Sequence, residues 1–243
     1  MSLTSLLNVA RGAMLAHQRA VSVAGHNIAN AETPGFSRQR VNLAAATPEP
    51  IPPFGQVGRG VDILSIERLR SGFYDENWRR ETGVGGQFQS LSETLQQVSG
   101  IIGEPSDTGI SAGLDNLIDA FQTLASNPVD QAARAVVLAN ATSLTDKFHS
   151  ISNRIDRVSS NIGAQVAQIA GEANALLHEL GELNIQIRAA NGQAPDLLDR
   201  RDMAIDRLSG YLDIRVVERE QGTVDVLRGG LQLVASSGAT QEL

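Results

Sequence analysis

The side chains most able to do chemistry are few and widely spaced. The four histidines are His17, His26, His149 and His178. His17 and His26 fall on one predicted helix nine residues apart, so their side chains do not face the same way. No two histidines have the i,i+4 spacing that places two imidazoles on one metal ion. The histidines therefore predict solvated or helix-packing side chains rather than a metal centre.

Three aspartates form the other group with chemical potential. Asp199, Asp202 and Asp206 recur at helical spacing, as metal ligands could. Arginines stand beside them in the sequence, at Arg200, Arg201 and Arg207. Acids interleaved with arginines are typical of a solvated helix face. This segment therefore predicts a charged exterior and no bound metal.

Other catalytic motifs are also missing from the sequence. The chain has no cysteine, which excludes disulfides, thiolate catalysis and Cys-based zinc sites. It contains no nucleophile elbow, Walker loop or dinucleotide fingerprint, and turns explain its glycine-rich stretches at residues 58–60 and 83–86. We therefore expect no enzyme activity and no cofactor. A helical metal-dependent hydrolase is the remote alternative, and it would need a ligand cluster that the sequence does not offer.

The composition argues against a nucleic-acid or membrane partner. The 243 residues carry a net charge of -7 with acids and bases interspersed, so no basic face could neutralise phosphates. No apolar run approaches the ~18 residues that a membrane-spanning helix needs, and no cleavable signal peptide is visible. Aromatic residues make up only 4% of the chain, which suits helices packed through Leu, Ile, Val and Ala.

The elements that would position these side chains begin with a strongly periodic helix. Apolar or small residues recur at alternating spacings of three and four, the pattern of a coiled-coil strand. This assembly seam consists of Leu3, Leu7, Ala10, Met14, His17, Val21, Ala24 and Ile28. By periodicity alone, the seam suits a partner helix and a helix packed on its own domain equally well.

A turn motif ends this first helix. Asn30 suits the end of a helix because asparagine tolerates the left-handed conformation, and Pro34-Gly35 suits the centre of a type II turn. The whole motif consists of Asn27, Asn30, Thr33, Pro34, Gly35 and Phe36. Two predicted strands follow, over residues 37–43 and 57–69. The apolar phase slips within the second strand, which indicates a β-bulge or burial on both faces.

Helices dominate the next part of the sequence. Three-four spacing predicts helices over residues 88–102, 110–124 and 130–191, the last roughly 90 Å long if it is continuous. Glycines at residues 83–86 should kink or interrupt the helix around them. Pro195 can open a further helix, after which three short strands form a predicted meander.

These elements predict a mainly α fold. We expect an elongated antiparallel helical bundle or coiled coil with a long central helix. A small β-hairpin should follow the N-terminal helix, and a partial antiparallel β meander should lie at the C-terminus. The predicted domains are a coiled-coil assembly helix with its turn (1–35), a β-hairpin segment (36–72), a helical bundle (73–210) and the start of a truncated β domain (211–243).

Several segments resemble one known family. Residues 27–36 (NIANAETPGF) resemble the turn of the bacterial flagellar axial proteins, which are the rod, hook and hook-associated proteins. Residues 115–125 (DNLIDAFQTLA), 127–138 (NPVDQAARAVVL) and 197–202 (LLDRRD) are similar to flagellar hook-associated protein 1, the first hook–filament junction family. The likeness covers the whole chain in order and corresponds to the N-terminal part of that family.

The resemblance implies a structural subunit of the bacterial flagellum that joins hook to filament. Family members are exported unfolded by the flagellar type III apparatus, without a cleaved signal peptide, and their terminal helices assemble into an extracellular inner coiled-coil tube. The implied partners are other copies in a ring, the hook protein, the second hook-associated (junction) protein and the export machinery. Members bind their export chaperone through a C-terminal region that this chain lacks, so chaperone binding is doubtful.

The alternative within the same superfamily is a flagellar rod or hook subunit. Those proteins enter β domains soon after the N-terminal motif. Here residues 88–208 are predicted to be largely helical, which favours the junction family.

Overall fold

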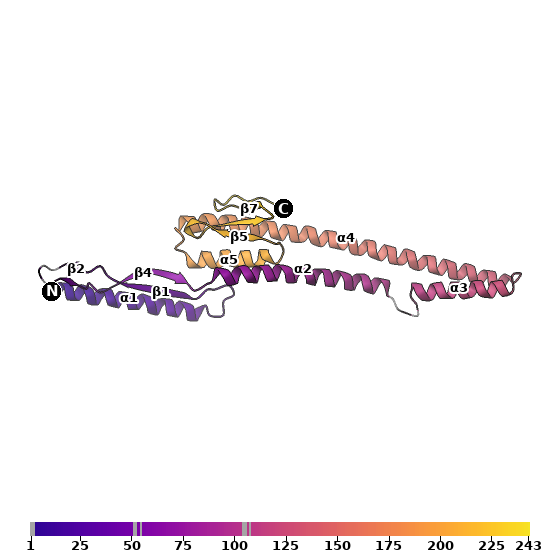
Figure 1. Ribbon diagram of the computed structural model, residues 1–243, viewed down its shortest axis with the longest axis horizontal. Helices are drawn as coiled ribbons and strands as arrows, with labels where there is room; N and C mark the ends of the chain where they lie inside the picture. The colour runs from indigo at the N-terminus through magenta and orange to yellow at the C-terminus, as the bar shows by residue number, and fades with distance from the viewer. Residues whose placement is uncertain (1–2, 51–52, 54, 104–105, 107) are drawn as a thin grey trace. The chain divides into compact units, whose positions relative to one another are not determined.

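The computed structural model describes residues 3–50, 53, 55–103, 106 and 108–243 of the chain. Within these residues the chain forms five α-helices, α1–α5, and seven strands, β1–β7 (Figure 1). The elements belong to two compact units. Residues 1–83 and 173–243 form the first unit, and residues 84–172 form the second.

Helix α1 (Leu3–Ala29) lies along a β-hairpin in the first unit (Figure 1). The hairpin strands β1 (Gln39–Ala45) and β4 (Val61–Arg68) pair antiparallel. Their register shifts between Asn42 and Leu43, which confirms the predicted β-bulge. The hairpin gives α1 a packing partner inside the chain, which the periodicity of the helix did not identify.

The connection between β1 and β4 is itself partly paired. Strands β2 (Glu49–Pro50) and β3 (Gln56–Val57) form a short antiparallel ladder. Gly60, just before β4, has a φ of 99°, and a β-carbon added there would lie 3.2 Å from Cγ1 of Val9. Glycine is therefore required where this connection passes α1, both for its backbone conformation and for the close approach.

Helix α2 (Gly72–Ile102) runs without interruption through residues 83–86, so the predicted interruption at these glycines is wrong. A glycine inside a helix costs only about 1 kcal/mol relative to alanine, which tertiary packing can outweigh. Gly83 has such a packing role, because a β-carbon there would lie 3.2 Å from the carbonyl oxygen of Ser209. The lack of a side chain lets another segment approach the helix closely.

The second unit contains helix α3 (Ile110–Ser126) packed on the first part of α4 (Gln131–Ala189). The contact uses small residues: a β-carbon at Gly113 would lie 3.0 Å from Cδ1 of Leu144. The buried residues of this contact are Gly113, Ala120, Ala133, Val137 and Leu144. With 59 residues, α4 is about 90 Å long, which confirms the predicted long central helix.

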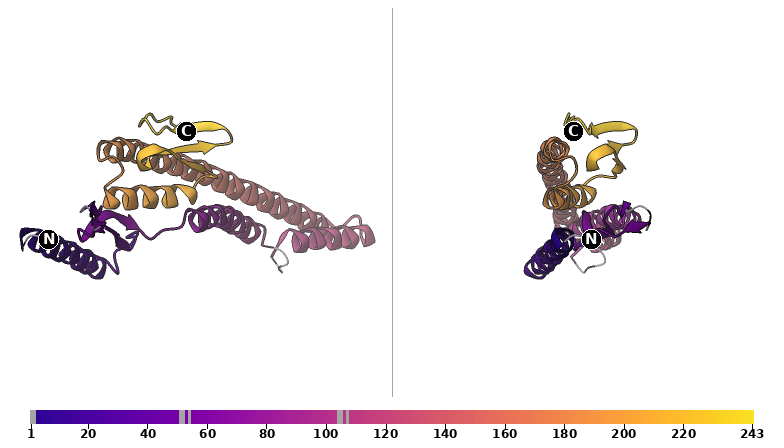
Figure 2. Two further views of the ribbon diagram at one scale, coloured as in Figure 1. Left: turned by 60° about the vertical axis from the view of Figure 1, so that its left-hand side comes forward. Right: turned by 90° about the vertical axis from the view of Figure 1, so that its left-hand side faces the viewer.

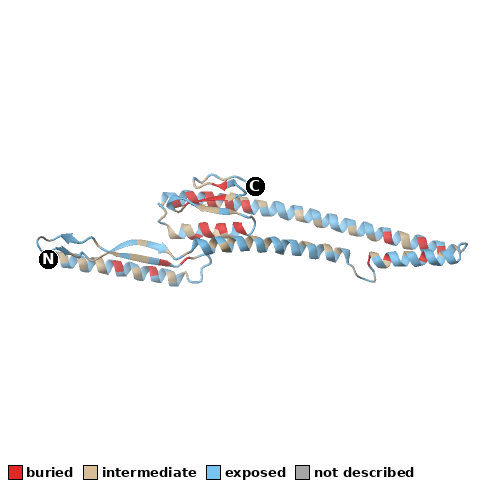
Figure 3. Ribbon diagram, in the orientation of Figure 1, coloured by how far each residue is buried: buried red, intermediate tan, exposed pale blue. Residues whose placement is uncertain are grey.

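The main core lies in the first unit, where the end of α4 meets α5 (Pro195–Ser209) and a three-stranded antiparallel sheet (Figure 2). The sheet has the order β5 (Arg215–Glu218), β6 (Val224–Arg228), β7 (Leu231–Val234). Buried residues concentrate on these elements (Figure 3). The core residues are Ala173, Leu176, Leu177, Leu180, Ala204, Ile205, Leu208, Val224, Val226, Leu233 and Val234.

The turn between α4 and α5 follows the predicted pattern. Asn191 and Gly192 both have positive φ, and the amide of Gly192 donates a hydrogen bond to the carbonyl of Ile187 (2.9 Å). A β-carbon at Gly192 would lie 2.7 Å from the carbonyl oxygen of Gln221, so no other residue fits there. Pro195 then begins α5, where a missing N–H is harmless.

The mainly α fold with a long central helix, a hairpin after the first helix and a C-terminal three-stranded sheet is thus confirmed. Among the residues that the structure describes, no helix is both long and apolar enough to cross a bilayer. The same residues contain no group of three acidic or histidine side chains arranged to hold a metal ion.

Candidate assembly surface

All eight residues of the assembly seam are exposed on α1. The large side chains are the most exposed, with Leu3 at 75%, Met14 at 74% and Ile28 at 77% of their full surface. Contiguous apolar surface of this kind is rare on a monomeric protein and marks a contact site. The seam is therefore brought together on one side of the helix and left without cover by the described residues of the chain.

The opposite side of α1 faces the hairpin. Ala16 and Val23 are the buried residues of the helix, at 2% and 8% exposure. Each stands two positions after a seam residue, Met14 or Val21, which is about 200° around the helix at 100° per residue. One face of α1 is thus fixed inside the chain and the other is presented outward. Sequence reasoning missed the inner face, because its small residues carry little periodic signal.

Asn27 of the turn motif joins the end of α1 to β1. Its side-chain amide donates a hydrogen bond to the carbonyl of Gln39 (2.8 Å), and its side-chain oxygen accepts one from the amide of Gln39 (2.9 Å). The side chain thus pairs with a backbone unit as a neighbouring strand would. It fixes the direction in which the chain returns along the helix.

Asn30 closes the last turn of α1. Its side-chain amide donates to the carbonyl of His26 (3.0 Å), and its side-chain oxygen accepts from the hydroxyl of Thr33 (3.3 Å). The ring of Phe36 then meets His26 edge to face, with centroids 5.3 Å apart. The asparagine, threonine and phenylalanine of the motif therefore hold the turn against the helix that it ends.

Gly35 adopts the conformation that the sequence predicts. Its φ is 78°, and the amide of Phe36 donates to the carbonyl of Thr33 (3.2 Å), as in a type II turn that begins at Thr33 with Pro34 second. A β-carbon at Gly35 would lie 2.9 Å from Sδ of Met203 on α5. The turn motif is therefore pressed against α5, a contact that local sequence patterns cannot reveal.

The predicted charged exterior at Asp199, Asp202 and Asp206 is wrong. Asp199 and Asp202 are buried, at 6% and 4% exposure, together with Arg201. Their partners come from distant segments, since Nη1 of Arg68 lies 2.7 Å from Asp199 and 2.8 Å from Asp202. The alternating acids and arginines are typical of a solvated helix face, but here several of them pair with one another in a buried network of ion pairs.

We call this network the arginine–aspartate cluster; it consists of Arg68, Arg70, Arg79, Arg201, Asp75, Asp199, Asp202 and Asp206. Arg70 bonds Asp75 (2.6 Å) and Asp206 (3.0 Å), and Arg79 bonds Asp206 (2.7 Å). Nη2 of Arg79 is buried without a hydrogen-bond partner in the described structure.

The electrostatics of the cluster favour its charged form. Burial by itself raises the pKa of Asp202, but Arg201 and Arg68 outweigh that effect and hold the pKa below its ordinary value. Burial likewise lowers the pKa of Arg70, yet its bonds to Asp75 and the nearby Asp202 raise it overall. Each aspartate is occupied by arginine, so the cluster offers neither a metal site nor a free general base.

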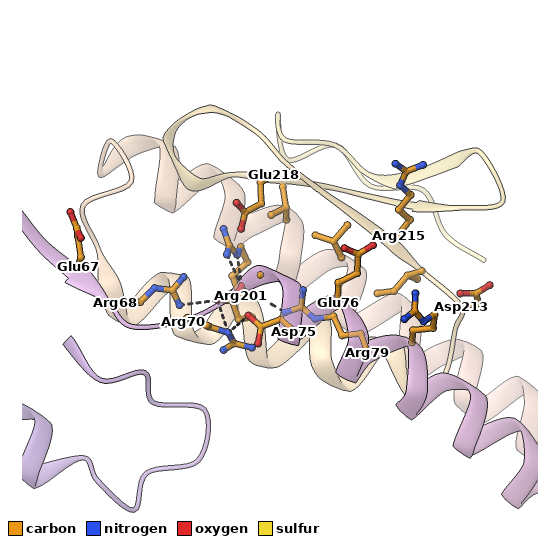
Figure 4. A pocket seen from close by; sticks show the side chains of 16 residues that line it. Glu67, Arg68, Arg70, Asp75, Glu76, Arg79, Arg201, Asp213, Arg215 and Glu218 are labelled. Carbon is orange, nitrogen blue, oxygen red and sulfur yellow. Dashed lines mark hydrogen bonds and ion pairs between the residues drawn. The ribbon is translucent and has the colours of Figure 1, made fainter. Parts of the chain in front are cut away.

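A cleft of about 700 Å³ opens beside the cluster (Figure 4). It lies between the start of α2, the end of β4, α5 and β5, with Arg68, Arg70 and Arg201 gathered at one side. Asp75, Asp202 and the four arginines of the cluster line the cleft, and no histidine is among the described residues that line it.

Comparison with known proteins gives two family matches. Residues 95–242 match the family described as "Flagellar hook-associated protein FlgK helical domain". Residues 7–36, which hold most of α1 and the turn motif, match "Flagella basal body rod protein". The two matches together cover the meander, the helical bundle from residue 95 onward and most of the N-terminal helix with its turn.

Individual relatives agree with these matches. Flagellar hook-associated protein 1 of Bacillus subtilis is 34% identical over 225 residues, which is 89% of this chain and 44% of that protein. The Salmonella typhimurium protein of the same name is 26% identical, over 98% of this chain and 44% of its own length. The chain therefore spans less than half the length of these curated relatives.

A solved structure gives the same result. The flagellar hook junction protein FlgK from Burkholderia pseudomallei superposes with a TM-score of 0.59 at 25% identity, over 67% of this chain and 29% of that chain.

Proposed function

Because the chain belongs to the flagellar hook-associated protein FlgK family, we propose that it acts as a structural subunit of the bacterial flagellum at the junction between hook and filament. The role is mechanical, and the family is not a class of enzymes. The location that follows is extracellular, in the flagellum itself.

The observation that carries the proposal is the exposed assembly seam. An apolar stripe with three-four spacing suits a strand of a coiled coil, in which side chains of one helix pack into holes on a partner helix. Leu7 and Val21 are 62% and 72% exposed, so the part of the chain that the structure describes supplies no such partner for them. We propose that the seam packs against helices of neighbouring subunits in a ring.

The turn motif has a complementary role in this proposal. Asn27 and Gly35 fix how the chain leaves α1, through the bonds to Gln39 and the contact with Met203. Residues 1–35 would thus form the assembly segment, and residues 36–72 the β-hairpin that supports it. Residues 73–210 would form the helical bundle, and residues 211–243 the start of a β domain.

Further partners follow from the position of the subunit. The hook protein would lie on one side of the ring and the second hook-associated protein on the other. A subunit outside the cell has to be exported, and we propose that the flagellar type III apparatus does so, with the N-terminal segment as the part that it reads.

A pair of substitutions in the seam tests this function. A strain producing the full-length protein with Leu7→Asp and Met14→Asp should form hooks that carry few filaments, because two charges would enter the proposed coiled coil. The matched control is Asn8→Asp with Ser22→Asp, which adds the same charge at exposed positions of α1 outside the seam. Filaments attached normally in the seam variant would rule the assembly role out.

A further inference from the structure

Residues 197–202 (LLDRRD) carry a family likeness, but an assembly seam on α1 does not explain them. In the structure they form the start of α5, and their charged residues point in two directions. Arg200 is exposed and lies 3.6 Å from Glu179. Asp199, Arg201 and Asp202 are buried. The buried three belong to the arginine–aspartate cluster, and two of them, Asp199 and Asp202, bond residues of the segment that carries the seam.

The described residues of the segment 3–69, which contains α1, the turn motif and the hairpin, contribute nothing to the main core. Their buried apolar contacts are internal, through Ala16 and Val23. Besides the close approach of Gly35 to Met203, this segment contacts α5 through polar groups. The amide of Ser37 donates to Asp199 (3.1 Å), and Arg68 bridges Asp199 and Asp202.

These two contacts hold both ends of the hairpin segment on one helix. Ser37 stands just before β1, and Arg68 is the last residue of β4. Asp199 accepts from both, through separate oxygens. Arg201 holds Asp202 in place, because it bonds both Asp202 and the carbonyl of Gly222. Hydrogen bonds between charged groups are directional, so such a cluster specifies an orientation more sharply than an apolar contact does.

We propose that Asp199 and Asp202 are positioning residues, which fix the direction of α1 and its seam relative to α5 by gripping Ser37 and Arg68. The use of that direction in assembly rests on the function proposed above. The bonds of Asp199 and Asp202 to Ser37 and Arg68, which we call the grip, are a property of the isolated chain. The core side of α5, with Ala204, Ile205 and Leu208, is separate from it, so the grip can be weakened while the core remains.

The distance between α1 and α5 measures the grip directly. The chain has no cysteine, so Ser22→Cys on α1 and Arg207→Cys on α5 accept two spin labels at exposed positions and nowhere else. Pulsed electron resonance then gives the distribution of distances between the labels. The labelled but otherwise unchanged chain should give a single narrow distribution.

Two substitutions of Arg68 distinguish positioning from general stability. Arg68→Met keeps the alkyl length but removes the charge, and the width of the distribution should increase about twofold or more, because two buried carboxylates lose their bridge. Arg68→Lys restores a charge and should return most of the narrowness. Arg200→Gln, on the exposed side of α5, is the matched control and should leave the distribution unchanged.

Asp199→Asn is the second variant, because it keeps an oxygen for the Ser37 amide while it removes the charge; it should broaden the distribution as well. Circular dichroism and the melting temperature report whether the core remains. Distributions that stay narrow in Arg68→Met or Asp199→Asn would overturn the proposal, as would an equal broadening in Arg68→Lys. The measurement involves no assembly, so its failure and a failure of the seam variants are separate results.

Discussion

Asn27 and Gln39 are bound to each other by two hydrogen bonds, of 2.8 and 2.9 Å, that link the end of α1 to the start of β1. This pairing turns a helix and a hairpin into one body. It also keeps the inner face of α1 occupied, which leaves the assembly seam on the outer face. The family's turn motif thus both reverses the chain direction and fastens α1 to the hairpin, and we call the Asn27–Gln39 pair the bracket.

Replacing Asn27 should loosen α1 from the hairpin. In Asn27→Ala, two partly buried groups of Gln39 lose their partners, which should cost about 1–3 kcal/mol. Amide hydrogen exchange along α1 should speed up about tenfold or more, as expected for such a loss. Asn8→Ala, at an exposed position of the same helix, is the control. Equal protection of α1 in the two variants would show that the bracket contributes nothing.

Gly35 and Gly85 should respond to alanine in opposite directions. Gly35→Ala places a side chain at a φ of 78° and 2.9 Å from Met203, so the free energy of unfolding should fall by about 1–3 kcal/mol. Gly85 lies within α2 with no atom near its added β-carbon, so Gly85→Ala should raise that energy by up to about 1 kcal/mol. Urea unfolding measures both changes.

A double variant tests the two causes at Gly35 separately. Met203→Ala in the Gly35→Ala background removes the steric contact but leaves the backbone strain, so it should recover part of the loss. If Gly35→Ala proves as stable as the natural chain, the turn does not press on α5.

Acid should weaken the arginine–aspartate cluster. Asp202 faces Arg201 on α5, Arg68 at the end of β4, Arg70 just beyond it and Arg79 on α2. Burial raises the pKa of Asp202, but the arginines lower it by a larger amount, so that it lies below the ordinary value of about 3.9. A carboxylate with a depressed pKa contributes stability that is present above the ordinary pKa and is lost as the pH falls through the folded-state pKa.

The free energy of unfolding should therefore hold steady from neutral pH to about pH 5 and then decline as Asp202 is protonated. Asp202→Asn should be less stable at neutral pH and should show a shallower decline in acid. Asp225, whose pKa is also lowered, by Arg219 and the amide of Ser236 against the opposing effect of burial, contributes a decline that both chains share. Identical acid slopes in the two chains would show that Asp202 is not coupled to its arginines.

The sequence predicted elements well wherever their cause is local. The helix α1, the type II turn at Pro34-Gly35 and the helix start at Pro195 each follow from periodicity or from the conformational limits of single residues. The three-four spacing also gave the long α4. These features need no knowledge of what lies across the fold.

The misjudged features depend on contacts between distant segments. Asp199 and Arg68 are 131 residues apart, so the sequence near Asp199 does not reveal their ion pair. The arginines next to Asp199 and Asp202 in the sequence instead led to the prediction of a solvated helix face. The continuity of α2 through residues 83–86 was misjudged because helix propensity is a weak guide where packing decides. The inner face of α1 buries only Ala16 and Val23, and two residues leave almost no hydrophobic pattern to read.

The central claim is that the seam of α1 is buried only on assembly, and Met14 tests it most directly. Met14→Cys can be introduced into the full-length protein, and its rate of alkylation by N-ethylmaleimide can be measured in the monomer and in isolated flagella. Met14 is 74% exposed, so the cysteine should react fast in the monomer. In assembled junctions it should react more slowly, by about tenfold or by a larger factor. Equal rates in the two states would contradict the account.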